Sequence, residues 1–166
     1  MTITLLAWAA LVAQQPDSAK VARFQAPLDS VDVALDVLRG ALARFSTDLP
    51  TTSRQLVLDR AAGVQRACTG GVSALQRLHQ QVTSESFGGR AVADQRNLVH
   101  ATATLISTLQ RCQREWTASP ASPVRADSLR AWGPYRSRSL NEAVRIYTTP
   151  ALTFRGKTGT GKPPRM

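Results

Sequence analysis

The chain has few aromatic residues, two cysteines and no long hydrophobic run. Among its 166 residues, 5% are Phe, Trp or Tyr, which argues against the aromatic platforms on which single-stranded nucleic acids stack. No apolar run approaches the ~20 residues of a membrane-spanning helix. The cysteines form neither a CxxC nor a CxxCH motif, which excludes c-type haem attachment. With 43% hydrophobic residues, the composition is that of one small folded domain.

Positive charge is abundant but unevenly distributed. The net charge of +10 divides into −1 for residues 1–50, +4 for residues 51–122 and +7 for residues 123–166. Such asymmetry is typical of an interacting arm, and Arg suits bidentate pairing with carboxylates and phosphates. A codon bias toward Arg would give the same excess. The predicted partner- or anion-binding residues are Arg125, Arg130, Arg136, Arg138, Arg145, Arg155, Lys157, Lys162 and Arg165.

The first thirteen residues resemble a secretory signal peptide. The apolar stretch that ends at Ala13 is followed at once by polar residues, as at a cleavage site. No Lys or Arg precedes it, and Leu11 stands where a small residue is usual. If it were retained, a helix of ~16 Å could not cross a bilayer core of ~30 Å, but it could anchor at an interface. The anchoring residues would be Leu5, Leu6, Trp8 and Leu11.

Apolar residues recur at alternating spacings of three and four in three long stretches. Such seams are typical of helices packed at shallow angles. The sequence therefore predicts an all-α fold, a small antiparallel helical bundle of three main helices, two short C-terminal helices and extended termini. Gly133-Pro134 and Pro150 are expected to end the two short helices. The predicted segments are 1–13 (signal-like), 14–26 (linker), 27–117 (bundle core), 118–150 (short basic helices) and 151–166 (flexible basic tail).

Cys68 and Cys112 lie on the seams of the second and third predicted helices. An antiparallel register that places them opposite each other also places Gly71 opposite Leu109, a small residue against a large one. The neighbouring Gly70 and Gly71 would let the two backbones approach closely enough for a disulfide. We therefore predict a Cys68–Cys112 disulfide, with two buried free thiols as the alternative.

Candidate catalytic and ligand sites are few. Residues 156–162 match GxxxxGK, but Pro163 replaces the Ser or Thr that binds magnesium, so we predict no nucleotide site. His79 and His100 are nearly opposite in the same register and are weak candidates for a metal or haem site. His79 lies ~16 Å along its helix from Cys68, too far to share a zinc ion. No nucleophile–base–orienter set is apparent, so we expect a non-enzyme without a cofactor.

Two functions fit these features. The first is an exported, periplasmic or secreted accessory subunit that stabilises a bacterial membrane-protein complex, photosynthetic or respiratory for example, on its outer face. Its partners would be proteins of that complex and anionic lipid headgroups. The second is a soluble periplasmic ligand- or metal-binding or sensor module. A basic nucleic-acid-binding protein is a minor alternative, favoured by the net charge and opposed by the N-terminus, the cysteines and the few aromatics.

Overall fold

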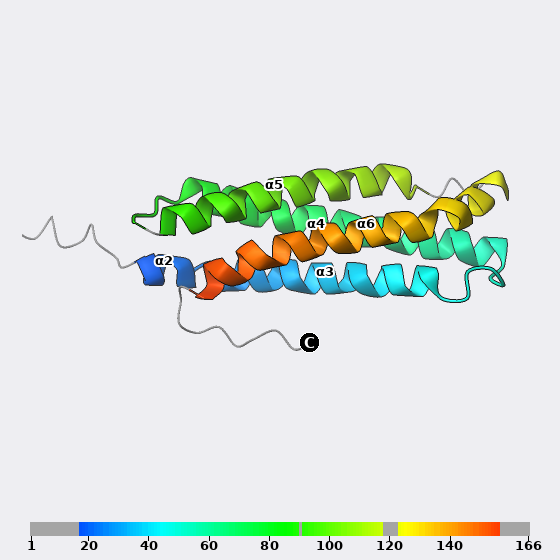
Figure 1. Ribbon diagram of the computed structural model, residues 1–166, viewed down its shortest axis with the longest axis horizontal. Helices are drawn as coiled ribbons and strands as arrows, with labels where there is room; N and C mark the ends of the chain where they lie inside the picture. Colours follow the sequence, from blue (N-terminus) through cyan, green and yellow to red (C-terminus); the bar gives the residue numbers. More distant parts are fainter. Residues whose placement is uncertain (1–16, 90, 118–122, 157–166) are drawn as a thin grey trace, which may run out of the picture.

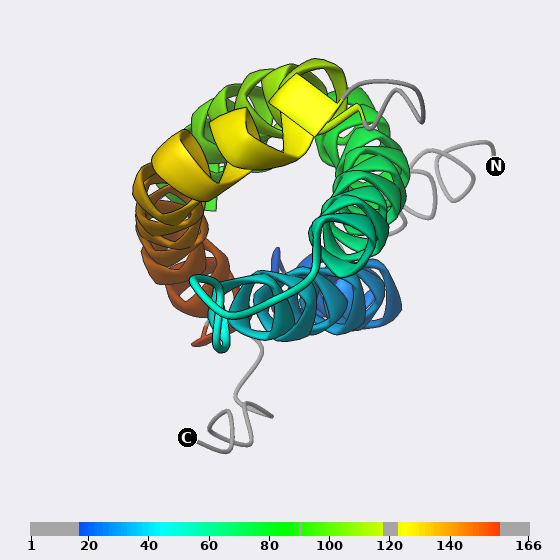
Figure 2. The same ribbon diagram turned by 90° about the vertical axis from the view of Figure 1, so that its right-hand side faces the viewer.

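Four long helices form an elongated antiparallel bundle (Figure 1). The computed structural model describes residues 17–89, 91–117 and 123–156. Its helices are α2 (Asp17–Ala22), α3 (Gln25–Ser46), α4 (Arg54–Ser84), α5 (Ala91–Glu115) and α6 (Pro123–Gly156). Viewed along the bundle, α3 to α6 follow one another around its axis in chain order (Figure 2). The predicted all-α antiparallel bundle is confirmed.

The predicted disulfide and its register are also confirmed. Cys68 and Cys112 are joined with their Cα atoms 6.2 Å apart. Both lie on buried seams of α4 and α5. A Cβ atom added to Gly71 would lie only 2.7 Å from Leu109 Cδ1, so the small residue faces the large one as expected. The bond therefore fixes the middle of α4 against the last turn of α5.

The C-terminal region differs from the prediction. One 34-residue helix, α6, replaces the two short helices and continues through Gly133, Pro134 and Pro150. A proline inside a helix costs about 3 kcal/mol. Burial of a seam along almost the whole of α6 outweighs that cost. The buried residues of this seam are Ala126, Leu129, Leu140, Val144, Tyr147, Ala151 and Phe154.

The predicted linker and tail both contribute to the core. Residues 17–22 of the expected linker form α2, and Phe24 is buried just before α3 begins. At the other terminus, residues 151–156 continue α6 instead of starting a flexible tail. The rings of Phe24, Phe87 and Phe154 meet with centroids 5.6–6.0 Å apart. This cluster joins residues from the expected linker, the α4–α5 turn and the expected tail, and it closes one end of the bundle.

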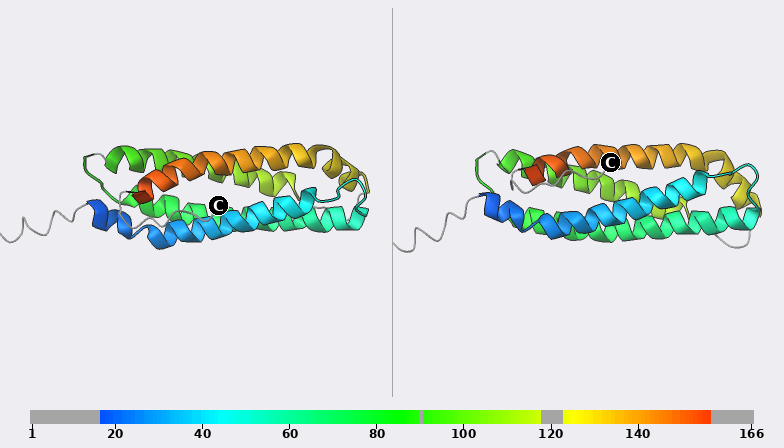
Figure 3. Two further views of the ribbon diagram at one scale, coloured as in Figure 1. Left: turned by 60° about the horizontal axis from the view of Figure 1, so that its bottom comes forward. Right: turned by 90° about the horizontal axis from the view of Figure 1, so that it is seen from below.

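A second aromatic cluster closes the opposite end. Trp116 lies between Phe45 and Trp132, with ring centroids 4.7 and 5.3 Å away. Phe45 packs against Gly133, where a Cβ atom would come within 2.7 Å of its Cζ atom. Gly133 is therefore a packing position of α6 and not a helix end. Views from below show α3 and α4 side by side along most of the bundle (Figure 3).

Candidate functional site

Arginine side chains gather at the end of the bundle where α3 leads into α4 and α5 leads toward α6. Residues 44–66, 111–117 and 125–138, here called the arginine-rich end, contain ten arginines and four acidic residues. The remaining described residues, here called the neutral half, contain seven basic and seven acidic residues. The antiparallel packing of four helices produces this polarity, because it brings the ends of α3 and α5 and the starts of α4 and α6 to the same end of the bundle (Figure 1).

Three arginines of this end are held in ion pairs. Arg54 and Arg130 both bind Asp127, with N···O distances of 3.1 and 2.8 Å. Arg136 binds Glu115 at 3.2 Å. These pairs occupy two of the four acidic side chains, so the net positive charge of the end remains.

Five further arginines of this end have no ion-pair or hydrogen-bond partner among the described residues. All five are exposed. Guanidinium groups with free donors and no competing carboxylate are suited to bidentate binding of carboxylate or phosphate groups from another molecule. The five are Arg44, Arg66, Arg111, Arg114 and Arg138.

Two basic hollows lie in this surface. One, of about 470 Å³, is lined by arginines and by Trp132, whose ring lies 5.6 Å from the Arg125 guanidinium carbon. Arg125 also donates to the carbonyl oxygens of Glu115 and Thr117. The other hollow, of about 260 Å³, is lined by Arg44, Arg60 and Arg66 around Asp59, among others. Each hollow offers several cationic groups around one acidic group.

Two predicted binding residues lie in the neutral half and are occupied there. Arg145 forms a bidentate pair with Glu142, with N···O distances of 2.8 and 2.7 Å. Arg155 is only 13% exposed and binds Asp29 at 3.1 Å and Asp32 at 2.8 Å. Burial raises the pKa of Asp32, and Arg155 partly offsets this rise. Arg155 therefore ties α6 to α3.

The arginine-rich end includes residues that the charge count along the sequence missed. Arg44, Arg60, Arg66, Arg111 and Arg114 belong to the first 122 residues, outside the quarter of the chain with the highest net charge. The antiparallel register could have found them, because it places the end of α3, the start of α4 and the end of α5 beside the start of α6.

The two histidines have different neighbours. Thr102 Oγ1 donates to the carbonyl of Val99 at 2.8 Å and lies 2.9 Å from His79 Nδ1. The Thr102 hydroxyl therefore lies within hydrogen-bond distance of both the Val99 carbonyl and the His79 ring. His100 is exposed and lines a groove between α5 and α6. Within the described part of the chain, no group of three or more His, Cys, Asp or Glu side chains is placed to hold a metal ion.

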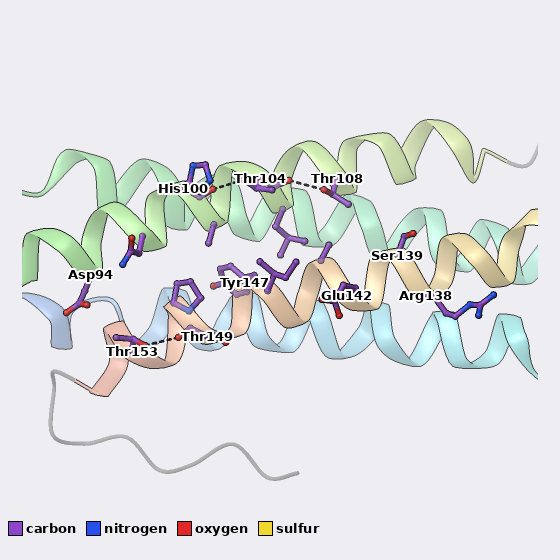
Figure 4. Close-up of a pocket in the computed structure, with 16 residues that line it drawn as sticks. Asp94, His100, Thr104, Thr108, Arg138, Ser139, Glu142, Tyr147, Thr149 and Thr153 are labelled. Carbon is purple, nitrogen blue, oxygen red and sulfur yellow. Dashed lines mark hydrogen bonds between the residues drawn. The ribbon is translucent and has the colours of Figure 1, made fainter.

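The α5–α6 groove has a volume of about 810 Å³. Figure 4 shows Arg138 at one end of it and Asp94 and Thr153 at the other. Ala101, Leu105 and Tyr147 are buried residues of its lining. Burial and the nearby charge of Asp32 raise the pKa of Tyr147 far above its ordinary value, so the phenol stays neutral.

Several predicted sites lie outside the described residues. These are the apolar anchor (Leu5, Leu6, Trp8 and Leu11) and the basic residues Lys157, Lys162 and Arg165. Among the residues that are described, no helix combines the length and the hydropathy needed to cross a bilayer.

No protein family, curated protein or solved structure matches this chain. The candidate site therefore stands on its geometry and charge.

Proposed function

We propose that the protein is a non-catalytic, exported accessory subunit that docks on an acidic surface of a bacterial membrane-protein complex. The observation that carries this proposal is the arginine-rich end, where five exposed arginines have no partner among the described residues. Complementary charge of this kind steers association and fixes the orientation of a complex.

Exposed apolar side chains at the same end favour a protein partner. Tyr135 is 62% exposed and Leu56 is 42% exposed. Tyr and Arg are enriched among the residues that dominate binding energy at protein interfaces. A surface for single-stranded nucleic acid would instead favour several exposed aromatic rings, and Trp116 is fully buried here. An exposed Tyr135 within the arginine-rich end suits an anchor with a charged rim.

The disulfide supports export. Disulfides persist in oxidising compartments such as the bacterial periplasm and are rare in the cytosol. Cys68 and Cys112 form a closed bond on buried seams, with no second thiol pair among the described residues for exchange. This favours a structural bond over a catalytic one, and it agrees with the signal-like character of residues 1–13.

The test compares two double variants in native cells. Arg111→Gln/Arg114→Gln removes two exposed charges from the arginine-rich end, and Arg77→Gln/Arg96→Gln removes two exposed charges from the neutral half. We expect the tagged wild-type protein to fractionate with membranes in a defined complex. The amount of the first variant recovered with the complex should fall by at least about tenfold, and the amount of the second variant should be unchanged.

The recovered wild-type protein also reports on export. We expect its intact mass to lack residues 1–13 and to be two hydrogens lighter than the dithiol form. Recovery of both variants at wild-type levels, or recovery of the wild type only as a free monomer, would contradict the proposal.

A further inference from the structure

Helices α5 and α6 each carry a second seam beside the one that faces the core. Five of the lining residues on α5 follow spacings of three and four, and five on α6 follow spacings of four and three. This alternation is the pattern by which one helix receives another, knobs into holes. The two seams are Asp94, Asn97, Ala101, Thr104 and Thr108 on α5, and Ser139, Ala143, Ile146, Pro150 and Thr153 on α6.

The groove is less polar than its threonines suggest. The hydroxyls of Thr104, Thr108 and Thr153 donate to carbonyl oxygens four residues earlier in their own helices, at 3.0 Å each. Figure 4 shows these bonds as dashed lines along the helices. Because each hydroxyl proton is already used, these side chains can cover an apolar occupant without leaving a donor unsatisfied.

We infer that the α5–α6 groove receives one amphipathic helix of a protein partner, with acidic residues in the last turn of that helix beside Arg138. From Asp94 to Thr108 the groove follows α5 for about 21 Å. A helix of about 14 residues covers that length. Small side chains such as Ala101 and Ala143 leave room for large apolar side chains from the occupant.

The open shape of the groove favours a helix over a lipid acyl chain. Small-molecule sites enclose most of the surface of their ligand. Here the floor is buried at Ala101 and Leu105, but Ile146 is 55% exposed, and Thr104 and Glu142 are exposed at the rim. An acyl chain in this groove would keep one side in water, whereas an amphipathic helix turns its polar face to the solvent.

The direction of the occupant follows from charge. Arg138 is exposed, lines the groove and has no partner among the described residues. A helix carries partial negative charge at its C-terminus. That terminus is therefore favoured at the Arg138 end, which is also where the groove meets the arginine-rich end.

This inference rests on the proposed function only in taking the partner to be a protein. The arginine-rich end acts through charge, and the groove acts mainly through the fit of apolar side chains, with Arg138 common to both. Variants of each can be made without altering the other, so the failure of one proposal is distinguishable from the failure of the other.

The experiment uses a fluorescent synthetic helix as the probe for the oxidised, full-length protein. The peptide has about 14 residues, with Leu at three-four spacing and two Glu in its last turn. A control peptide has the same composition with its Leu residues distributed around the helix. Thr104→Trp places a large ring in the groove, and Ser107→Trp places the same ring on an exposed position of α5 outside the groove.

Fluorescence anisotropy should show binding of the first peptide and not of the control peptide. Thr104→Trp should weaken binding by at least about tenfold, and Ser107→Trp should leave it unchanged. Equal binding by both variants, or no binding to the wild type, would overturn the inference.

A charge swap gives a second test that does not depend on how the protein tolerates a new tryptophan. Arg138→Glu should weaken binding of the Glu-ended peptide and strengthen binding of a Lys-ended peptide, whereas Arg77→Glu, on an exposed position of the neutral half outside the groove, should change neither. If Arg77→Glu has the same effect as Arg138→Glu, the response is one of general charge and the inference is wrong.

Two further measurements identify other occupants. The groove would be a lipid site if the wild type binds phosphatidylglycerol vesicles but not the peptide, and if Thr104→Trp abolishes the binding of vesicles. The groove would bind a second copy of the chain if the wild type self-associates in sedimentation equilibrium and Thr104→Trp abolishes that self-association. Either result would overturn the inference.

Discussion

The two ends of the bundle differ in how much of their arginine charge is neutralised. The neutral half contains seven basic and seven acidic residues, and its Arg155 is 13% exposed and binds two aspartates of α3. The arginine-rich end also uses arginines in ion pairs that join α6 to α4 and α5. It contains ten arginines and only four acidic residues, so exposed arginines such as Arg111 and Arg114 have no partner among the described residues. The two ends therefore differ in the positive charge that remains after pairing.

The difference does not come from a weaker core at the arginine-rich end. Phe45 and Trp116 are both fully buried there, and Phe24, Phe87 and Phe154 close the opposite end. Both ends are packed around aromatic side chains, so the excess of positive charge lies on a rigid surface. A rigid, unpaired cationic surface binds a partner at lower entropic cost than a flexible arm would. Four sets of substitutions test this difference between the two ends.

Removal of the disulfide has the largest expected effect. Cys68→Ala/Cys112→Ala opens a loop of sequence separation 44, which in the chain-entropy model costs about 4 kcal/mol of unfolding free energy. The bond lies beside the arginine-rich end, whose like charges repel one another. Hydrogen exchange should therefore accelerate more in residues 54–66 and 111–117 than in the neutral half. A loss below about 1 kcal/mol in urea unfolding, or equal acceleration in both halves, would contradict this account.

A methyl group at Gly133 is expected to have the next largest effect. Its Cβ atom would overlap the Phe45 ring, and overpacking of this kind costs about 1–3 kcal/mol. Gly63→Ala is the matched control, because no atom lies within 4 Å of its added Cβ atom. That control should stabilise the helix by about 0.5–1 kcal/mol. Thermal unfolding of both variants checks the pair, and destabilisation by Gly63→Ala alone would refute the packing assigned to Gly133.

Replacement of Arg155 and of Arg138 compares the stability cost of losing a paired arginine with that of losing an exposed one. Arg155→Met should cost about 1–2 kcal/mol at pH 7, because it leaves Asp29 and Asp32 unpaired while they are only half-exposed. Arg138→Met should change stability by less than about 0.5 kcal/mol. Equal losses in the two variants would contradict the division between paired and available arginines.

The loss from Arg155→Met should also depend on pH. Removal of Arg155 takes away an interaction that lowers the pKa of Asp32, so that pKa rises further above the ordinary value of 3.8. A carboxyl group whose pKa is raised in the folded state stabilises that state when the pH lies below the unfolded-state pKa. This stabilisation is lost as the pH rises through the folded-state pKa. Urea unfolding should therefore give a small deficit at pH 3 and the full deficit at pH 7. A deficit of the same size at both pH values would show that the ion pair does not cause it.

Neutralisation of the free arginines has the smallest expected effect on stability. Arg111→Gln/Arg114→Gln should raise the unfolding free energy by up to about 0.5 kcal/mol at low salt, because it reduces repulsion among like charges. At about 1 M salt the Debye length falls to about 3 Å and the gain should disappear. Arg77→Gln/Arg96→Gln, in the neutral half, should not raise stability at either salt concentration. A gain of the same size in both variants would remove the contrast.

The sequence predicts the parts of this fold that depend on local spacing. The seams of α3, α4 and α5, the opposition of Gly71 to Leu109 and the disulfide all follow from three-four spacing and one antiparallel register. Ser53 also begins α4 as its capping residue, accepting a hydrogen bond from the Leu56 amide at 3.3 Å. These features need little information from distant parts of the chain.

Features that depend on distant packing could not be predicted in the same way. Pro134 and Pro150 favour helix ends locally, and only burial of the α6 seam against three other helices overrides them. Phe24 and Phe154 lie at opposite ends of the described chain and meet only in the folded bundle. The arginine-rich end likewise becomes visible only when four helix ends are brought together.

Titration of the oxidised protein with a poly-glutamate peptide, followed residue by residue by NMR, tests the docking surface most directly. We expect the amide shifts to concentrate in residues 44–66, 111–117 and 125–138, and Arg111→Gln/Arg114→Gln to weaken binding by about tenfold. Shifts of equal size in the neutral half, or unchanged affinity in that variant, would contradict the claim that the arginine-rich end is the docking surface.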